Sequence, residues 1–209
     1  MEADDAAEGI LLSTCAPTGA GNVMLKRFFS RSRFDDATHD LYDTIVAQAR
    51  QPVLYTELAV PDTLDGRFDL VVLHAILVMR RLRKSGEAGA DRAQLVFDIM
   101  FADFDRTLRE IGVGDLKVGK RIKQMAQAFY GRAQSYGEAL DQDDEAMLAQ
   151  GLRRNLYGTS EPSEAAVAGV TAYVLAQEAH LAGQADADLD AGRLSFAPAV
   201  LPAADRVSI

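Results

Sequence analysis

Apolar residues recur along this chain at spacings of three and four, the period of helices that are buried on one face. From residue 35 onward the pattern predicts long helices over 64–83, 95–111, 118–140, 145–157 and 160–183, with shorter helices before residue 60. No segment shows the alternation of a strand, and no repeat of fixed period is present. We therefore expect an all-α fold, a single-domain bundle of about six to eight helices.

Three segments carry more specific signals. The middle of 64–83 is apolar nearly all round, which is typical of a central, buried helix. Gly131 falls inside the helix expected over 118–140, where glycine costs about 1 kcal/mol relative to alanine, so we expect a second helix to approach closely there. The segment 84–89 is rich in small and polar residues and predicts a loop.

The helical pattern fades at both ends of the chain. We expect residues 1–34 to form a disordered, partly basic tail, 35–185 the helical domain, and 186–209 a flexible C-terminal tail. Met24 and the basic, aromatic segment after it resemble a natural start, so residues 1–23 are interpreted as an upstream extension. The same basic segment suits contact with an anionic membrane surface.

Composition narrows the functional classes. The net charge of −9 and the pI near 4.8 argue against general binding of nucleic acid, and we expect no DNA partner. The one cysteine, Cys15, excludes an intramolecular disulfide and suits a reducing compartment. The N-terminus is acidic, unlike a secretory signal, and no apolar stretch is long enough to span a bilayer. We therefore expect a cytoplasmic protein, with peripheral contact at the inner membrane as a further expectation.

The run 108–121 holds the main evidence for an enzyme. Gly114, followed after four residues by Gly119 and Lys120, has the spacing of a phosphate-binding loop. That motif needs Ser or Thr after the lysine to hold Mg²⁺, but Arg121 stands there. It also needs a preceding strand, whereas the residues before it have a helical pattern.

We therefore interpret this run as a connector between two helices. Gly112 or Gly114 supplies the left-handed residue that commonly follows a helix. Asp115 is expected to cap the next helix and to favour its N-terminal dipole.

Other candidate chemistry has little support. The histidines are His39, His74 and His180. They fall on separate helices without a second His or Cys at ligand spacing, so we expect no zinc site, and we interpret His74 as a hydrogen-bonded core residue.

The carboxylates of 98–110 lack the Glu-x-x-His pairs of a di-iron bundle. We expect helical ion pairs in their place, Asp105 with Arg109 and Arg106 with Glu110. No catalytic residue, metal or cofactor is expected.

Two basic groups stand out in this acidic chain. The first comprises Lys117, Lys120, Arg121, Lys123 and Arg132. It lies around the start of the helix expected over 118–140, where cations are disfavoured, so we interpret it as a candidate contact surface. The second comprises Arg80, Arg81, Arg83 and Lys84. It lies at the end of 64–83, where the helix dipole favours positive charge.

A set of short stretches between about residues 40 and 142 forms a specific combination. They are Val60-Pro61-Asp62-Thr63, Gly66-Arg67-Phe68-Asp69, Leu73-His74, Arg81-Leu82, Phe101-Ala102-Asp103, Leu108-Arg109-Glu110, Gly112-Val113-Gly114-Asp115-Leu116, Val118-Gly119-Lys120 and Phe129-Tyr130-Gly131-Arg132. Together they resemble the ubiquinol–cytochrome c chaperone family.

This resemblance implies a helical, non-enzymatic assembly factor. Mitochondrial members of the family bind newly made cytochrome b near the ribosomal tunnel exit, work with a small helical partner, and support assembly of ubiquinol–cytochrome c reductase. This chain lacks an Arg/Ser-rich transit peptide and looks bacterial. Its implied partner is cytochrome b or another membrane-embedded respiratory subunit, with the ribosome and a small helical protein as further candidates. The alternative is a helical scaffold that docks an acidic or phosphate-bearing partner, and a nucleotide-dependent enzyme ranks third.

A chaperone of this kind needs an apolar groove and charges that set the register of its client. We expect the groove between 64–83 and 118–140. The candidate partner-binding residues are Arg67, His74, Asp103, Arg109, Asp115, Lys117, Lys120, Arg121, Lys123 and Arg132. Structural roles compete for three of them, Asp115 as a cap, Arg109 in an ion pair and His74 in the core.

Overall fold

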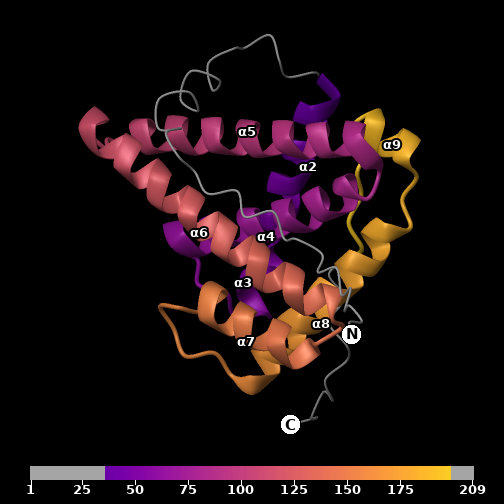
Figure 1. Cartoon of the computed structure of the whole chain (residues 1–209). Coiled ribbons are helices and arrows are strands. Elements are labelled where there is room, and N and C mark those ends of the chain that lie inside the picture. The colour runs from indigo at the N-terminus through magenta and orange to yellow at the C-terminus, as the bar shows by residue number, and fades with distance from the viewer. Residues whose placement is uncertain (1–35, 199–209) are drawn as a thin grey trace, which may run out of the picture. The chain divides into compact units, whose positions relative to one another are not determined.

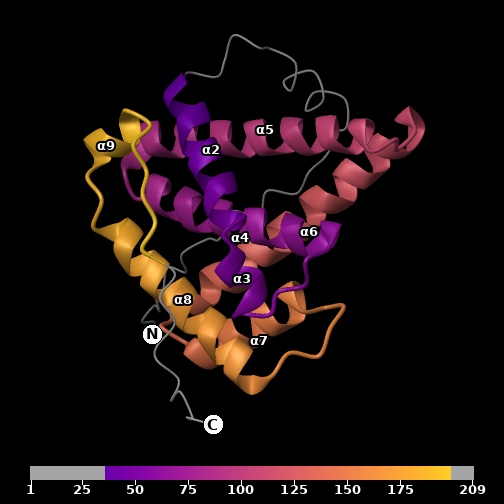
Figure 2. The same ribbon diagram turned by 180° about the vertical axis from the view of Figure 1, so that it is seen from behind.

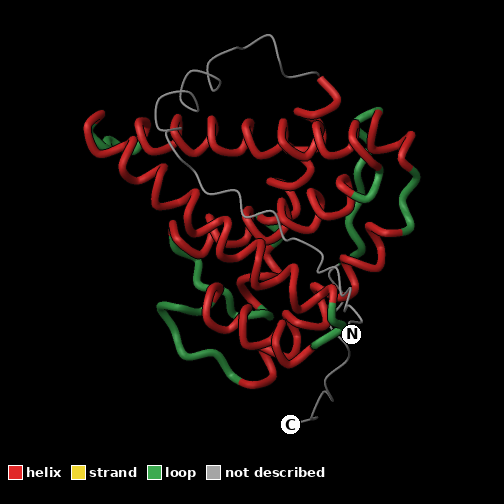
Figure 3. Tube along the Cα trace, viewed as in Figure 1, coloured by secondary structure: helices red, strands yellow, loops and turns green. Residues whose placement is uncertain are grey.

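The computed structural model describes residues 36–198, and all regular structure in this range is helical (Figures 1 and 3). The helices are α2 (Asp36–Ala49), α3 (Pro52–Thr56), α4 (Leu64–Arg83), α5 (Gly86–Glu110), α6 (Asp115–Asp141), α7 (Glu145–Leu156), α8 (Glu164–Ala182) and α9 (Asp186–Asp190). The expected all-α fold is confirmed. None of these helices is both long and apolar enough to cross a bilayer. The predictions for Cys15, for the basic segment after Met24 and for 199–209 lie outside the described residues.

Helix α4 is the centre of the bundle, as its apolar sequence predicts. It packs against α2, α5, α6, α7 and α8, which surround it in both views (Figures 1 and 2). Within 70–79, every side chain except that of Val71 is buried. The helix begins after Thr63, whose hydroxyl accepts a hydrogen bond from the Gly66 amide at 3.1 Å.

The connection between α4 and α5 is shorter than the loop expected over 84–89, because α5 already begins at Gly86. Gly89 lies in the first turn of α5, where a Cβ would come within 2.1 Å of the Leu82 carbonyl oxygen. The small residue therefore lets the two helices approach at their junction. The composition that indicated a loop in the sequence reflects a tight helix–helix contact.

The connection between α5 and α6 is the short loop that the run 108–121 predicts. Gly112 has a left-handed φ of +86°, as expected after a helix. Helix α6 begins at Asp115, with Gly114 in the capping position and no side-chain cap. The prediction of Asp115 as the cap is therefore wrong. Its carboxylate instead lies 2.6 Å from the Arg109 guanidinium.

The prediction for Gly131 is also wrong. Gly131 is exposed, and a Cβ at this position would meet no atom within 4 Å. The tighter approach on α6 occurs at Gly137, which is buried and whose Cβ would lie 3.3 Å from the Arg80 guanidinium. A helical period shows which face is buried but not which turn meets a neighbour.

The structure also differs from the flexible tail expected from residue 186. Helix α9 follows α8 directly, and the segment 191–198 returns along α8. The Gln177 side chain exchanges two hydrogen bonds with the Ala197 backbone, at 2.9 and 2.8 Å. The Phe196 ring packs edge-on against His74, with 5.3 Å between the ring centroids. These contacts join residues far apart in the chain, so a local pattern cannot indicate them.

Candidate functional site

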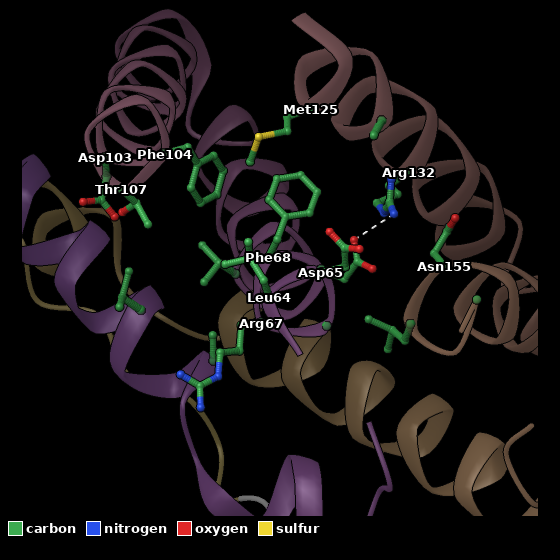
Figure 4. A pocket seen from close by; sticks show the side chains of 18 of the residues that line it. Leu64, Asp65, Arg67, Phe68, Asp103, Phe104, Thr107, Met125, Arg132 and Asn155 are labelled. Carbon is green, nitrogen blue, oxygen red and sulfur yellow. Dashed lines mark ion pairs between the residues drawn. The ribbon is translucent and has the colours of Figure 1, made fainter. Parts of the chain in front are cut away.

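A pocket of about 590 Å³ opens between α4, α5 and α6, with α2 and α7 contributing at its edges (Figure 4). It lies where the sequence predicts a groove, between α4 and α6. Helix α5 supplies a further wall that the sequence did not indicate. The volume is within the range of about 300–1,000 Å³ that is typical of binding pockets.

Apolar side chains form the inner wall of this pocket. Phe68 of α4 and Phe104 of α5 have ring centroids 5.1 Å apart, and Met125 of α6 lies beside them (Figure 4). Leu64, at the first position of α4, remains 53% exposed. The pocket therefore presents concave apolar surface to solvent, which is typical of a binding site.

A buried ion pair lies at one end of the pocket. The guanidinium of Arg132 lies 2.7 Å from an oxygen of Asp69. Its central carbon is 5.8 Å from the centre of the Phe68 ring, and Arg132 and Phe68 are both labelled in Figure 4. Burial raises the pKa of Asp69 to about 6, against the opposing effect of Arg132. At neutral pH the carboxylate is ionised and paired, so this end of the pocket is polar with little net charge.

Further charged contacts lie around the pocket. Asp65 of α4 and Arg121 of α6 approach to 3.4 Å and join the two helices. Both side chains are largely exposed, so this pair contributes little to stability. On the α5 side, Asp103 accepts a hydrogen bond of 2.9 Å from the hydroxyl of Tyr42. Burial and the Asp103 charge raise the pKa of Tyr42, which keeps this hydroxyl a donor.

The structure divides the predicted partner-binding residues between two regions and the core. Those that line the pocket are Arg67, Asp103, Arg121 and Arg132. Those at or near the α5–α6 connection are Arg109, Asp115, Lys117, Lys120 and Lys123. Their roles in binding stay predictions. The predicted helical ion pairs are confirmed, with Arg109–Asp105 at 2.7 Å and Arg106–Glu110 at 3.9 Å.

His74 is fully buried and has the structural role that its apolar surroundings indicate. Its Nδ1 and Nε2 lie 2.7 Å from the Leu70 carbonyl oxygen and from the Tyr173 hydroxyl, respectively. A carbonyl can only accept, so Nδ1 carries the proton and Nε2 accepts from Tyr173. The Tyr173 oxygen in turn accepts from Gln48 at 2.9 Å. Burial lowers the pKa of His74 to about 4, so the ring is neutral at pH 7.

The run 108–121 does not form a phosphate-binding loop. The amides of Lys117 and Val118 donate to the Gly114 carbonyl, at 2.7 and 3.2 Å, and are thus used inside α6. Helix α5 stands where that motif requires a strand. Within 36–198, no group of His, Cys, Asp and Glu side chains is arranged to hold a metal ion.

The apolar lining of the pocket was not recognised from the sequence. Phe104 and Met125 both have helical spacing, which predicts only that they lie on the inward faces of their helices. In the structure α6 is well covered at Phe129, whereas Ile122 and Met125 remain half-buried. No local signal separates these positions, because a pocket wall and a core share the same residue types and period.

Three kinds of comparison relate the chain to known proteins. Residues 56–196 match the model of the family described as ubiquinol-cytochrome C chaperone. The crystal structure of the Cbp3 homolog from Brucella abortus is 37% identical and superposes with a TM-score of 0.72, covering 85% of this chain and 97% of that one.

Curated relatives are more distant. The ubiquinol-cytochrome-c reductase complex assembly factor 1 of Xenopus laevis is 25% identical over 116 residues, which are 56% of this chain and 58% of the relative. The mouse protein of the same name is 22% identical over 121 residues, which are 58% of this chain and 41% of the relative. The chain thus spans about half the length of these relatives. On the family match and the solved structure, it belongs to the ubiquinol-cytochrome C chaperone family.

Proposed function

We propose that this protein is an assembly chaperone of ubiquinol–cytochrome c reductase, and that its pocket holds an apolar segment of newly made cytochrome b. Family membership supports the first part, and the names of the curated relatives agree with it. The observation that carries the second part is the apolar pocket between α4, α5 and α6. A chaperone needs no catalytic group, and the proposal includes no chemical step.

The pocket suits a membrane-protein segment for two physical reasons. Leu64 and Met125 remain accessible, so they can exclude water from apolar client side chains. A volume of about 590 Å³ admits a few side chains of a helix rather than a whole subunit. Charged groups beside the apolar wall, such as Arg121 and Asp103, can set the register of the client at little cost because they stay partly solvated.

Substitution of the accessible wall tests this proposal. We expect Leu64→Asp and Met125→Asp each to weaken client binding by roughly 10–100-fold, since a carboxylate buried against apolar client surface lacks a partner. In a strain lacking the gene, these variants should fail to restore cytochrome b levels and reductase activity. Gln127→Asp is the matched control because Gln127 is an exposed residue of the same helix that does not line the pocket. Circular dichroism would establish that all three variants fold.

Crosslinking distinguishes the client from other partners. A photoreactive side chain at Leu64 should capture cytochrome b in cells, and the same group at Gln127 should not. Equal capture at both positions, or normal cytochrome b levels in the deletion strain, would contradict the proposal. A salt-sensitive complex without cytochrome b would instead indicate a scaffold that docks an acidic partner.

A further inference from the structure

The turn between α5 and α6 exposes large apolar side chains. Leu116, in the first turn of α6, is 99% exposed, and Ile111, just after α5, is 55% exposed. In both views the two helices converge on this turn at the edge of the bundle, away from α7, α8 and α9 (Figures 1 and 2). A single exposed leucine is ordinary, but these two residues flank one short turn. We call residues 110–123 the α5–α6 tip.

Lysines surround the exposed leucine. Lys120 and Lys123 follow Leu116 by four and seven residues and therefore share its face of α6. The opposite face, with Val118 and Phe129, is buried. Lys117 is also exposed and lies next to Leu116.

The described part of the chain gives these lysines no charged partner. Lys117, Lys120 and Lys123 form no ion pair within 36–198, whereas Arg121 pairs with Asp65 and Asp115 pairs with Arg109. Positive charge in the first turn of a helix opposes the helix dipole, so Lys117 is unfavourable for α6 itself. An exposed leucine likewise contributes no burial energy. The tip thus carries apolar side chains that are exposed and cationic side chains that form no ion pair within 36–198.

We propose that the α5–α6 tip docks the protein on an anionic lipid surface. Ile111 and Leu116 enter the boundary between headgroups and acyl chains, and the three lysines contact the lipid phosphates. Their long side chains reach the headgroups while their aliphatic parts stay near the apolar layer. Charge sets the orientation, because the chain as a whole carries −9 and is repelled by the same surface elsewhere.

The composition of the tip favours lipid over RNA. Binding to RNA would involve the lysines but would not bury Ile111 and Leu116. The tip also has no aromatic residue on which a base can stack. Docking on lipid uses both kinds of side chain and is independent of the client in the pocket.

Vesicle binding by the full chain tests this proposal. We expect co-sedimentation with vesicles that contain phosphatidylcholine and phosphatidylglycerol, and weak binding to phosphatidylcholine alone. The variant Lys117→Gln/Lys120→Gln/Lys123→Gln should lose affinity by roughly 100-fold. Ile111→Ser/Leu116→Ser should lose roughly tenfold or more. The control Arg83→Gln/Lys84→Gln/Arg193→Gln makes the same change in charge at exposed positions elsewhere and should bind like the wild type.

A fluorescence measurement locates the contact. The chain contains no tryptophan, so Leu116→Trp introduces a single reporter. Its emission should shift to shorter wavelength on anionic vesicles, and brominated lipids should quench it. Gln142→Trp, at the other end of α6, should show neither effect. Unchanged vesicle binding by either tip variant, or binding of RNA in place of vesicles, would overturn the proposal. Such a result would not affect the proposal that the pocket holds a segment of cytochrome b.

Discussion

Arg81→Ala is expected to lower the free energy of unfolding by about 3 kcal/mol, because it removes a largely buried guanidinium together with its hydrogen bonds to α8 and α9. The guanidinium is almost wholly buried at the end of α4. It donates to the Leu181 carbonyl at 3.0 Å, to the Gln184 carbonyl at 2.5 Å and to the Asp186 carboxylate at 2.6 Å. It thereby joins α4 to the end of α8 and the start of α9. Urea unfolding followed by circular dichroism measures the effect.

Two further variants separate geometry from charge. Arg83→Ala removes an exposed cation from the same turn of α4 and should change stability by no more than about 0.5 kcal/mol. Arg81→Lys keeps the charge but lacks the planar fork that meets several acceptors, so it should fall between the wild type and Arg81→Ala. Equal stability of Arg81→Ala and Arg83→Ala would show that the contacts of Arg81 are not needed for folding.

The basic group at the end of α4 has ion-pair partners that could not be predicted from the sequence. The helix dipole accounts for cations at that position, and the sequence therefore suggested one shared role for Arg80, Arg81, Arg83 and Lys84. In the structure Arg80 reaches Asp141 at 2.8 Å, and Lys84 reaches Glu178 at 3.2 Å. A local electrostatic rule predicts the sign of the charge. It cannot predict partners about 60 or 100 positions away, which only the packing of the helices brings close.

The cations of α6 likewise differ in their contacts in a way that their spacing in the sequence does not predict. They were read as one contact surface because they are close in sequence. The fold directs Arg132 into a buried pair with Asp69 and Arg121 to the pocket edge, and leaves Lys117, Lys120 and Lys123 exposed. By contrast, the apolar run of α4, the Gly112 turn and the Arg109–Asp105 pair depend on neighbours within a few residues. They were predictable for that reason.

Helix α6 thus joins two regions of different character. Its last turns are buried at Tyr136 and Ala139, its middle forms a pocket wall with Met125, and its first turn carries the exposed Leu116. A helix that leaves the core gradually keeps apolar residues accessible without unfolding, because its buried end holds it in place. If both proposals hold, a newly made client that reaches the membrane would meet the pocket of a chaperone already docked there.

Acidification is expected to destabilise the fold through His74. Burial lowers the pKa of His74 to about 4, below the value of 6.5 that we take for the unfolded chain. Between these values the unfolded state binds more protons, so stability falls as the pH falls, by about 1.4 kcal/mol per pH unit and about 3 kcal/mol in total. Urea unfolding at pH 7 and at pH 4 measures the loss. Asp69 acts in the opposite direction, because its raised pKa makes protonation favourable in the folded state.

Variants isolate the histidine from that opposing effect. His74→Asn retains a donor for the Leu70 carbonyl but does not titrate, and Asp69 remains in both proteins. The variant should be less stable than the wild type at pH 7, yet it should lose about 3 kcal/mol less between pH 7 and pH 4. If His74→Asn and the wild type lose the same stability in acid, His74 does not link α4 to Tyr173 as a neutral ring, and the acid sensitivity arises elsewhere.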